Sequence, residues 1–117
     1  MVNRPLFMSA VICTLAHATA VGMARAHPLY GLFLLTACAT SLWNHGTTGA
    51  VARFADRAFM VASIPITAFV SPHPVTWLTL ALLSVSYGAA KATGALAPHL
   101  AAHALITALN LRILGIL

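Results

Sequence analysis

The residues of this chain best suited to chemistry are three histidines. His99 and His103 are four positions apart, a spacing that places two imidazoles on the same face of a helix. Two such imidazoles can bind a single cation, and a third histidine from another helix, here His45, leaves a fourth position open for water. This ligand set is typical of catalytic zinc, which lowers the pKa of its water to about 7 and polarises a carbonyl. We therefore predict a metal site of His45, His99 and His103 with zinc as its cofactor.

Asp56 and Ser41 are the predicted catalytic residues beside that metal site. Asp56 is the only acidic residue in the 117-residue chain, so no other side-chain carboxylate is available. We expect it to orient a ligand of the metal or to act as a general base. Ser41 lies four residues before His45, and on a shared helix face its hydroxyl would hydrogen-bond the water or an oxyanion.

The same residues also have ordinary structural interpretations. Asp56 could pair with Arg53 or Arg57 at a helix N-terminus, where the helix dipole favours an anion. Ser41 could bond the backbone of its own helix. A pair of histidines four apart also arises by chance in a chain that holds six.

Three further histidines and two cysteines fit structural roles. His27 and His73 each precede a proline in an expected turn, so we interpret them as polar loop residues. His17 lies within an apolar stretch, where we expect a neutral imidazole bonded to a neighbouring helix. Cys13 and Cys38 also lie in apolar stretches and are expected to be buried free thiols.

The composition predicts an integral membrane protein. Hydrophobic residues make up 61% of the chain and charged residues 6%, whereas an average soluble domain carries about 25% charged residues. The length suits a single membrane domain over residues 1–117, with four or five crossings of about 20 residues each. The six Lys and Arg residues are scattered singly, which excludes a nucleic-acid surface and leaves membrane lipids as the expected partners.

Turn residues divide the apolar sequence into segments that predict an all-α fold, a polytopic membrane bundle of about five transmembrane helices. Glycines at both ends of 46–49 and prolines within 71–74 favour turns. Pro65 lies inside the third segment, where a kink is tolerated. The predicted helices are Pro5–Ala24, Pro28–Asn44, Ala52–Val70, Val75–Ala92 and a last segment from His99 to the C-terminus.

The basic residues predict the orientation. The first segment, followed by Ala24-Arg25-Ala26, also fits a cleaved secretory signal peptide, but we interpret it as a retained membrane helix. Five crossings then place four cations at one membrane edge and two at the other: Arg4, Arg53, Arg57 and Lys91 against Arg25 and Arg112. The positive-inside rule puts the first edge, with the N-terminus and the predicted site, in the cytoplasm.

The predicted site resembles the pattern of the CREST superfamily. The resemblance rests on Ser41-x3-His45, on Asp56 at the start of the next helix, and on His99-x3-His103 opening the last helix. The superfamily includes alkaline ceramidases, the progestin and adipoQ receptors and hemolysin III-like bacterial proteins, which are seven-helix membrane proteins thought to be zinc-dependent amide hydrolases of lipids.

For this chain the resemblance implies zinc ligation by the three histidines and hydrolysis of a lipid amide or ester. Asp56 would be a base or a residue supporting the ligands, and Ser41 a contact of the water or oxyanion. The interval between His45 and His99 is short by about two helices. Losing a pair of helices keeps both motifs at the same membrane face, but it removes part of the wall that would enclose a lipid chain.

A second resemblance implies a haem protein. In the small membrane anchor subunits of succinate dehydrogenase, a haem-ligating histidine is followed by a glycine four positions on and an aspartate eleven positions on, as in His45, Gly49 and Asp56. Arg4-Pro5-Leu6 is also similar to their N-terminal motif. This resemblance implies haem b and a quinone site, with the motif on one continuous helix.

A third interpretation is a structural membrane subunit without chemistry of its own. Abundant small residues permit close helix packing, as in subunits of respiratory or photosynthetic complexes. The partners would then be other membrane subunits or further copies of the chain.

Overall fold

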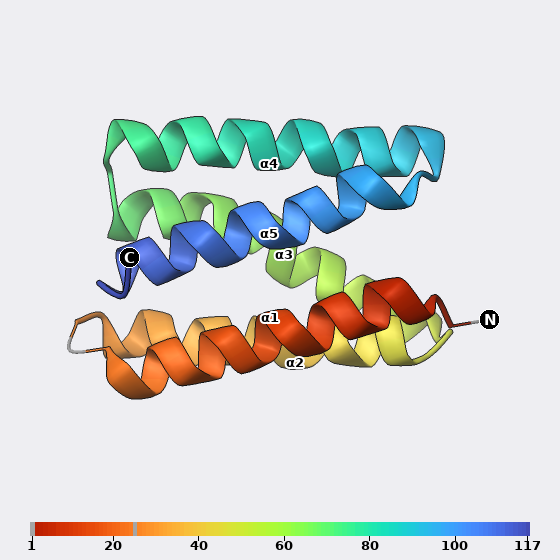
Figure 1. Cartoon of the computed structure of the whole chain (residues 1–117), viewed down its shortest axis with the longest axis horizontal. Helices are drawn as coiled ribbons and strands as arrows, with labels where there is room; N and C mark the ends of the chain where they lie inside the picture. Colours follow the sequence, from red (N-terminus) through yellow and green to blue (C-terminus); the bar gives the residue numbers. More distant parts are fainter. Residues whose placement is uncertain (1, 25) are drawn as a thin grey trace.

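The computed structural model describes residues 2–24 and 26–117 and consists of five α-helices joined by short turns (Figure 1). The helices are α1 (Arg4–Met23), α2 (Pro28–Gly46), α3 (Ala50–Val70), α4 (Pro74–Thr93) and α5 (Leu96–Ile113). No strand occurs in these two ranges, so the all-α prediction is confirmed. α5 begins at Leu96 rather than at the predicted His99, which places His99 within the first turns of the helix.

Local sequence signals fix where several helices begin and end. The Asn3 side chain caps α1 by accepting a hydrogen bond from the Leu6 amide at 3.2 Å, and His73 Nδ1 caps α4 by accepting from the Val75 amide at 3.1 Å. Prolines occupy the first turn of α1, α2 and α4, where no amide hydrogen is needed. α4 ends at Thr93 and is capped by Gly94, whose φ of 67° is the left-handed conformation that glycine adopts without strain.

The helices form a ring in which sequence neighbours run in opposite directions (Figure 1). α1 packs on α2 and α5, α2 packs on α3, and α5 packs on α4. α3 and α4 make the least contact of any packed pair, so the ring is loosest between them. The start of α1, the end of α2, the start of α3, the end of α4 and the start of α5 gather at one end of the bundle, which we call the site end.

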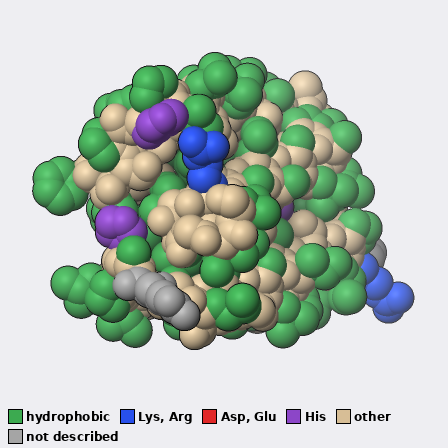
Figure 2. Space-filling model, turned by 60° about the vertical axis from the view of Figure 1, so that its left-hand side comes forward, with side chains coloured by type: hydrophobic (Ala, Val, Ile, Leu, Met, Phe, Trp, Pro, Cys, Tyr) green, Lys and Arg blue, Asp and Glu red, His purple; other side chains and the backbone are tan. Residues whose placement is uncertain are grey.

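The interior is lined by small and polar side chains, while many large apolar side chains face outward. Half of the buried hydrophobic residues are alanines, and five polar residues are buried with them. Large hydrophobic side chains are exposed on every helix, among them Leu29 at 80% and Phe69 at 87% of their surface. Figure 2, in which the opposite end comes forward, shows hydrophobic side chains around its margin, with histidine and basic side chains among them.

A chain of buried hydrogen bonds joins four helices. The Tyr30 hydroxyl on α2 donates to Asn110 Oδ1 on α5 at 2.6 Å, so Thr67 on α3, 2.8 Å away, donates to Tyr30. The Asn110 amide group donates to His17 Nε2 on α1 at 2.9 Å, and His17 Nδ1 donates to the Cys13 carbonyl at 2.7 Å. Both ring nitrogens of His17 are therefore engaged as a neutral imidazole, which agrees with the expectation from the sequence.

The structure supports only part of the predicted membrane topology. Within the described ranges, α1 is the one helix whose length and hydropathy by themselves suffice to cross a membrane. The other helices carry histidine, asparagine or charged residues that lower their mean hydropathy. The five crossings expected from the sequence are therefore not established by the helices taken one at a time. Met1 and Arg25, with the membrane edge assigned to Arg25, lie outside the described residues.

Candidate metal site

Three imidazoles meet at the site end. His45 comes from α2, and His99 and His103 come from successive turns of α5. The ring centroids lie 5.2 Å apart for His45 and His99, 5.3 Å for His45 and His103, and 5.0 Å for His99 and His103. One ring nitrogen from each histidine lies within 4.8 Å of the other two, and all three side chains are half-buried. The structure thus brings together the three predicted ligands.

Helix geometry explains how these rings converge. His45 lies in the last turn of α2, and α5 starts close enough to the same end for His99 to face it. The spacing of four residues then stacks His103 one turn deeper on the same face of α5. Residues 47–49 leave the helix after Gly46 and reverse the chain, so α3 returns alongside α2.

Asp56 is held by an asparagine and not by an arginine. Asn44 Nδ2 donates a hydrogen bond to Asp56 Oδ2 at 2.6 Å, which links α2 to α3. Within residues 2–24 and 26–117, neither Arg53 nor Arg57 lies at ion-pair distance from Asp56, and both arginines are exposed. The structural alternative of an ion pair within α3 is therefore wrong, because the carboxylate turns inward toward α2 while the arginines point outward.

His103 has a partner on α1. Ser9 Oγ lies 2.8 Å from His103 Nδ1, so this contact leaves Nε2 as the nitrogen available to a metal. For His103 to bind a metal through Nε2, Nδ1 must carry the proton and donate it to the serine oxygen. A hydrogen bond of this kind fixes the tautomer and the direction of a ligating imidazole.

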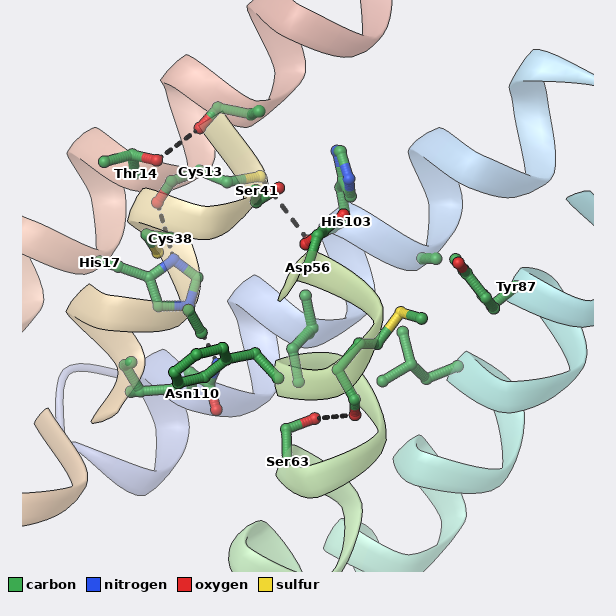
Figure 3. Close-up of a pocket in the computed structure, with 18 of the residues that line it drawn as sticks. Cys13, Thr14, His17, Cys38, Ser41, Asp56, Ser63, Tyr87, His103 and Asn110 are labelled. Carbon is green, nitrogen blue, oxygen red and sulfur yellow. Dashed lines mark hydrogen bonds between the residues drawn. The ribbon is translucent and has the colours of Figure 1, made fainter. Parts of the chain in front are cut away.

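The cluster opens into an elongated cavity of about 130 Å³ inside the ring of helices. Ser41 and Asp56 line this cavity together with the three histidines, and His17, Thr67 and Asn110 line it at the opposite end. Most of the wall between the two ends is apolar. From His99 to Asn110 the cavity follows α5 for about 16 Å at the helical rise of 1.5 Å per residue. Figure 3 shows Asp56 beside His103, with His17 and Asn110 further along.

Ser41 lines the cavity without a hydrogen bond of its own. Among the described residues no partner lies within hydrogen-bonding distance of its hydroxyl, although serines in apolar helices often bond their own backbone. The Ser41 hydroxyl is half-buried and available to a ligand.

Tyr87 and Lys91 on α4 complete the surroundings of the cluster. The Tyr87 ring lies edge-on to His99 with 5.9 Å between centroids, and Tyr87 lines the cavity. In Figure 3 its hydroxyl points toward the cavity. Lys91 Nζ lies 5.0 Å from the centroid of the Tyr87 ring, so a cation stands beside the histidines.

Sequence reasoning missed Ser9, Asn44 and Tyr87. Asn44 adjoins His45, and Tyr87 precedes Lys91 by one helical turn, but neither spacing distinguishes these residues from the many polar side chains of the helices. Ser9 is far from His103 in the sequence, and its role depends on α1 packing against α5. No local sequence pattern predicts a contact of this kind.

The haem resemblance requires a geometry that this fold lacks. His45 lies on α2 and Asp56 on α3, with the turn at 47–49 between them, whereas the anchor motif lies on one continuous helix. What the fold presents is three imidazoles from two helices with one carboxylate from a third. Comparison of the chain with protein-family models, with curated proteins and with solved structures finds no match.

Proposed function

We propose that this chain is a multi-pass membrane protein that binds zinc through His45, His99 and His103 and hydrolyses a lipid amide or ester. The proposal rests above all on one observation, the convergence of three imidazole nitrogens within 4.8 Å of one another beside a carboxylate. The resemblance to the CREST superfamily names the reaction class, and the shared elements are Ser41, Asp56 and the three histidines.

The donor set suits zinc. Nitrogens that ligate one tetrahedral zinc at 2.0–2.1 Å lie roughly 3.4 Å from one another. The three half-buried rings would have to bring their nitrogens, which lie within 4.8 Å of one another, to that spacing when zinc binds. Three protein ligands with a fourth position open is the arrangement of catalytic rather than structural zinc.

The distribution of side chains supports a membrane environment for the whole bundle. Large apolar residues exposed on all five helices would form an apolar surface far larger than monomeric proteins in water carry. The helices contain 18 to 21 residues each, close to the 20 that cross a hydrocarbon core. Polar residues turned inward and alanines between the helices fit the same environment.

The residues around the zinc site have separable roles in hydrolysis. Zinc, when bound, supplies a Lewis acid for the scissile carbonyl and makes water a nucleophile at neutral pH. Asp56 accepts the proton of the attacking water, and Asn44 keeps the carboxylate in place through one oxygen while leaving the other for that proton. Ser41 donates its hydroxyl to the carbonyl oxygen as negative charge develops there.

The cavity limits what part of a lipid enters the ring. A cavity of about 130 Å³ accepts a short apolar segment next to the scissile group and not a complete acyl chain. The rest of the chain would leave through the loose contact between α3 and α4 into the surrounding lipid.

The first experiment measures zinc in detergent-purified protein. We expect about one zinc per chain, since three ligands define one site, and loss of that zinc in the His99→Ala/His103→Ala variant. His27→Ala/His73→Ala, which removes two histidines at the opposite end of the bundle, is the matched control and should retain the metal.

Other results would redirect the proposal. Zinc-free wild-type protein with a Soret band would replace it with haem binding. Protein with neither cofactor that purifies only with partner subunits would replace it with a structural role. Zinc that survives the double substitution in α5 would show that the metal lies elsewhere.

A further inference from the structure

The site end carries a large excess of positive charge. Arg4, Arg53, Arg57 and Lys91 all lie there, on α1, α3 and α4, and all four are exposed. Asp56, the only acidic side chain of the sequence, accepts a hydrogen bond from Asn44. Within residues 2–24 and 26–117 none of these four cations forms an ion pair with a carboxylate. The charge that balances them must come from outside the chain.

Lys91 differs from the other three cations because it is directed at the site. Its ammonium group stands over the Tyr87 ring at 5.0 Å from the centroid, and the edge of that ring meets His99. A cation–π contact positions the ammonium group without neutralising it. Lys91 therefore places a positive charge one aromatic ring away from the histidine cluster, whereas Arg53 and Arg57 are exposed and have no aromatic contact that links them to it.

Tyr87 adds a hydrogen-bond donor to that charge. Its hydroxyl points toward the cavity, and among the described residues it has no hydrogen-bond partner (Figure 3). A hydrogen bond from an ammonium group to a carboxylate or phosphate oxygen is charge-assisted and stronger than a bond between neutral groups, so Lys91 would add to what the Tyr87 hydroxyl provides. An uncharged head group could accept a hydrogen bond from the Tyr87 hydroxyl, but it would leave the charge of Lys91 unbalanced.

Resting on the proposed function, we propose that Tyr87 and Lys91 select a ligand with an anionic group next to the apolar segment that enters the cavity. The shared chemistry is an anionic oxygen, supplied either by a carboxylate, as in a fatty acid released by hydrolysis, or by a lipid phosphate. Tyr87 donates its hydroxyl to that oxygen, and Lys91 provides the compensating charge. The pair thus determines which lipids this site accepts.

The test measures binding of three short amphiphiles that differ only in the head group. Purified zinc-loaded protein in an uncharged maltoside detergent is dialysed to equilibrium against labelled octanoate, octyl phosphate or octanol, with protein-free micelles as the background. We expect at least one of the two anions to bind tenfold or more tightly than octanol. The anion that binds more tightly identifies the source, carboxylate or phosphate.

Substitutions distinguish the contribution of Tyr87 and Lys91 to anion binding from that of the other positive charges. Lys91→Gln should lower the affinity for the preferred anion about tenfold, and Tyr87→Phe, which removes one neutral donor, about threefold. Arg57→Gln removes an exposed charge at the same end, and Arg112→Gln removes one at the opposite end. Both controls should leave the affinity within about twofold of the wild type, because neither residue touches the cluster.

The outcomes distinguish this inference from the proposed function. Equal binding of octanol and both anions would overturn the inference, as would a loss in Arg57→Gln as large as that in Lys91→Gln. Elemental analysis of each variant reports zinc independently, and we expect Lys91→Gln to retain it. If the protein binds zinc but does not prefer anions, the inference is contradicted and the metal site is not. If the protein binds no zinc but prefers anions in a way that depends on Lys91, the inference is supported and the metal site is contradicted.

Discussion

At the scale of single residues, hydrogen bonds within the protein determine which atoms of the candidate site remain available to a ligand. Asp56 uses one oxygen to accept from Asn44, and His103 uses Nδ1 in its contact with Ser9. Each of these contacts leaves one atom of the same side chain for the cavity. The supporting residues thus determine the roles of the carboxylate and the imidazole, which their identities alone leave open.

The Asp56→Asn substitution tests whether Asp56 acts as a general base or as a ligand of the metal. Asparagine keeps the shape of the side chain but cannot accept a proton from water, so hydrolysis of a fluorescent N-acyl lipid should fall by about 10²–10⁴-fold. Zinc content should stay unchanged. Arg57→Gln is the control and should keep full activity, because Arg57 does not pair with the carboxylate. Loss of zinc in Asp56→Asn would instead make Asp56 a ligand.

Ser9→Ala tests the residue that fixes His103. Without the serine oxygen the imidazole loses its preferred tautomer and direction, and we expect zinc affinity to fall about 10–100-fold. Competition with a fluorescent chelator measures this change. Ser84→Ala is the matched control, since Ser84 bonds only the Leu80 carbonyl of its own helix. An unchanged affinity in Ser9→Ala would mean that packing of α5 alone orients the ring.

At the scale of helices, the ring is held by polar contacts as well as by packing. A chain of hydrogen bonds runs from Thr67 on α3 through Tyr30 on α2 and Asn110 on α5 to His17 on α1. These side chains are almost fully buried, and the described residues contain no buried side-chain nitrogen or oxygen atom without a partner. A buried network in which every member is satisfied specifies one arrangement of the helices, because any other register leaves polar groups unpaired.

Tyr30→Phe should destabilise the bundle by about 1–3 kcal/mol, because Asn110 Oδ1 loses its donor and Thr67 loses its acceptor in a buried setting. Thermal unfolding in detergent, followed by circular dichroism, measures the change. Tyr87→Phe is the matched control, since the Tyr87 hydroxyl has no described partner, and it should unfold close to the wild type. Equal stability of all three proteins would show that water or lipid compensates the lost bonds.

At the scale of the whole molecule, the proposed membrane insertion predicts which way the bundle faces. The ring places the N-terminus at the site end and the C-terminus near the opposite end (Figure 1). An excess of basic residues at the site end favours the cytoplasmic side for the histidine cluster. The proposed lipid would then be reached from the cytoplasmic leaflet.

Cysteine labelling tests this orientation. In a background with Cys13→Ala and Cys38→Ala, Thr48→Cys lies in the turn after α2 and Pro72→Cys in the turn after α3. A membrane-impermeant maleimide should label Pro72→Cys in intact cells and Thr48→Cys only after permeabilisation. The reverse pattern would invert the orientation, and labelling of both turns in intact cells would show that α3 does not cross the membrane.

The sequence by itself determined the local features of this protein. Prolines, glycines and capping residues set the helix boundaries to within a few residues, because a turn depends on the residues that form it. The spacing of His99 and His103 placed both on one helix face, and alternating helix direction put His45 at the same end. Zinc, hydrolysis and the five membrane crossings stay predictions that the experiments above decide.

The tertiary structure decided which faces of the helices meet. That Asp56 turns to Asn44 and away from Arg53, and that Ser9 touches His103, follow from how helices far apart in the sequence rotate against one another. In an apolar chain the helical periodicity is a weak guide to that rotation, because large hydrophobic residues face outward and the interior is filled by alanines and a few polar groups. The sequence could name the three candidate metal ligands, whereas only the packed helices could name the residues that contact them.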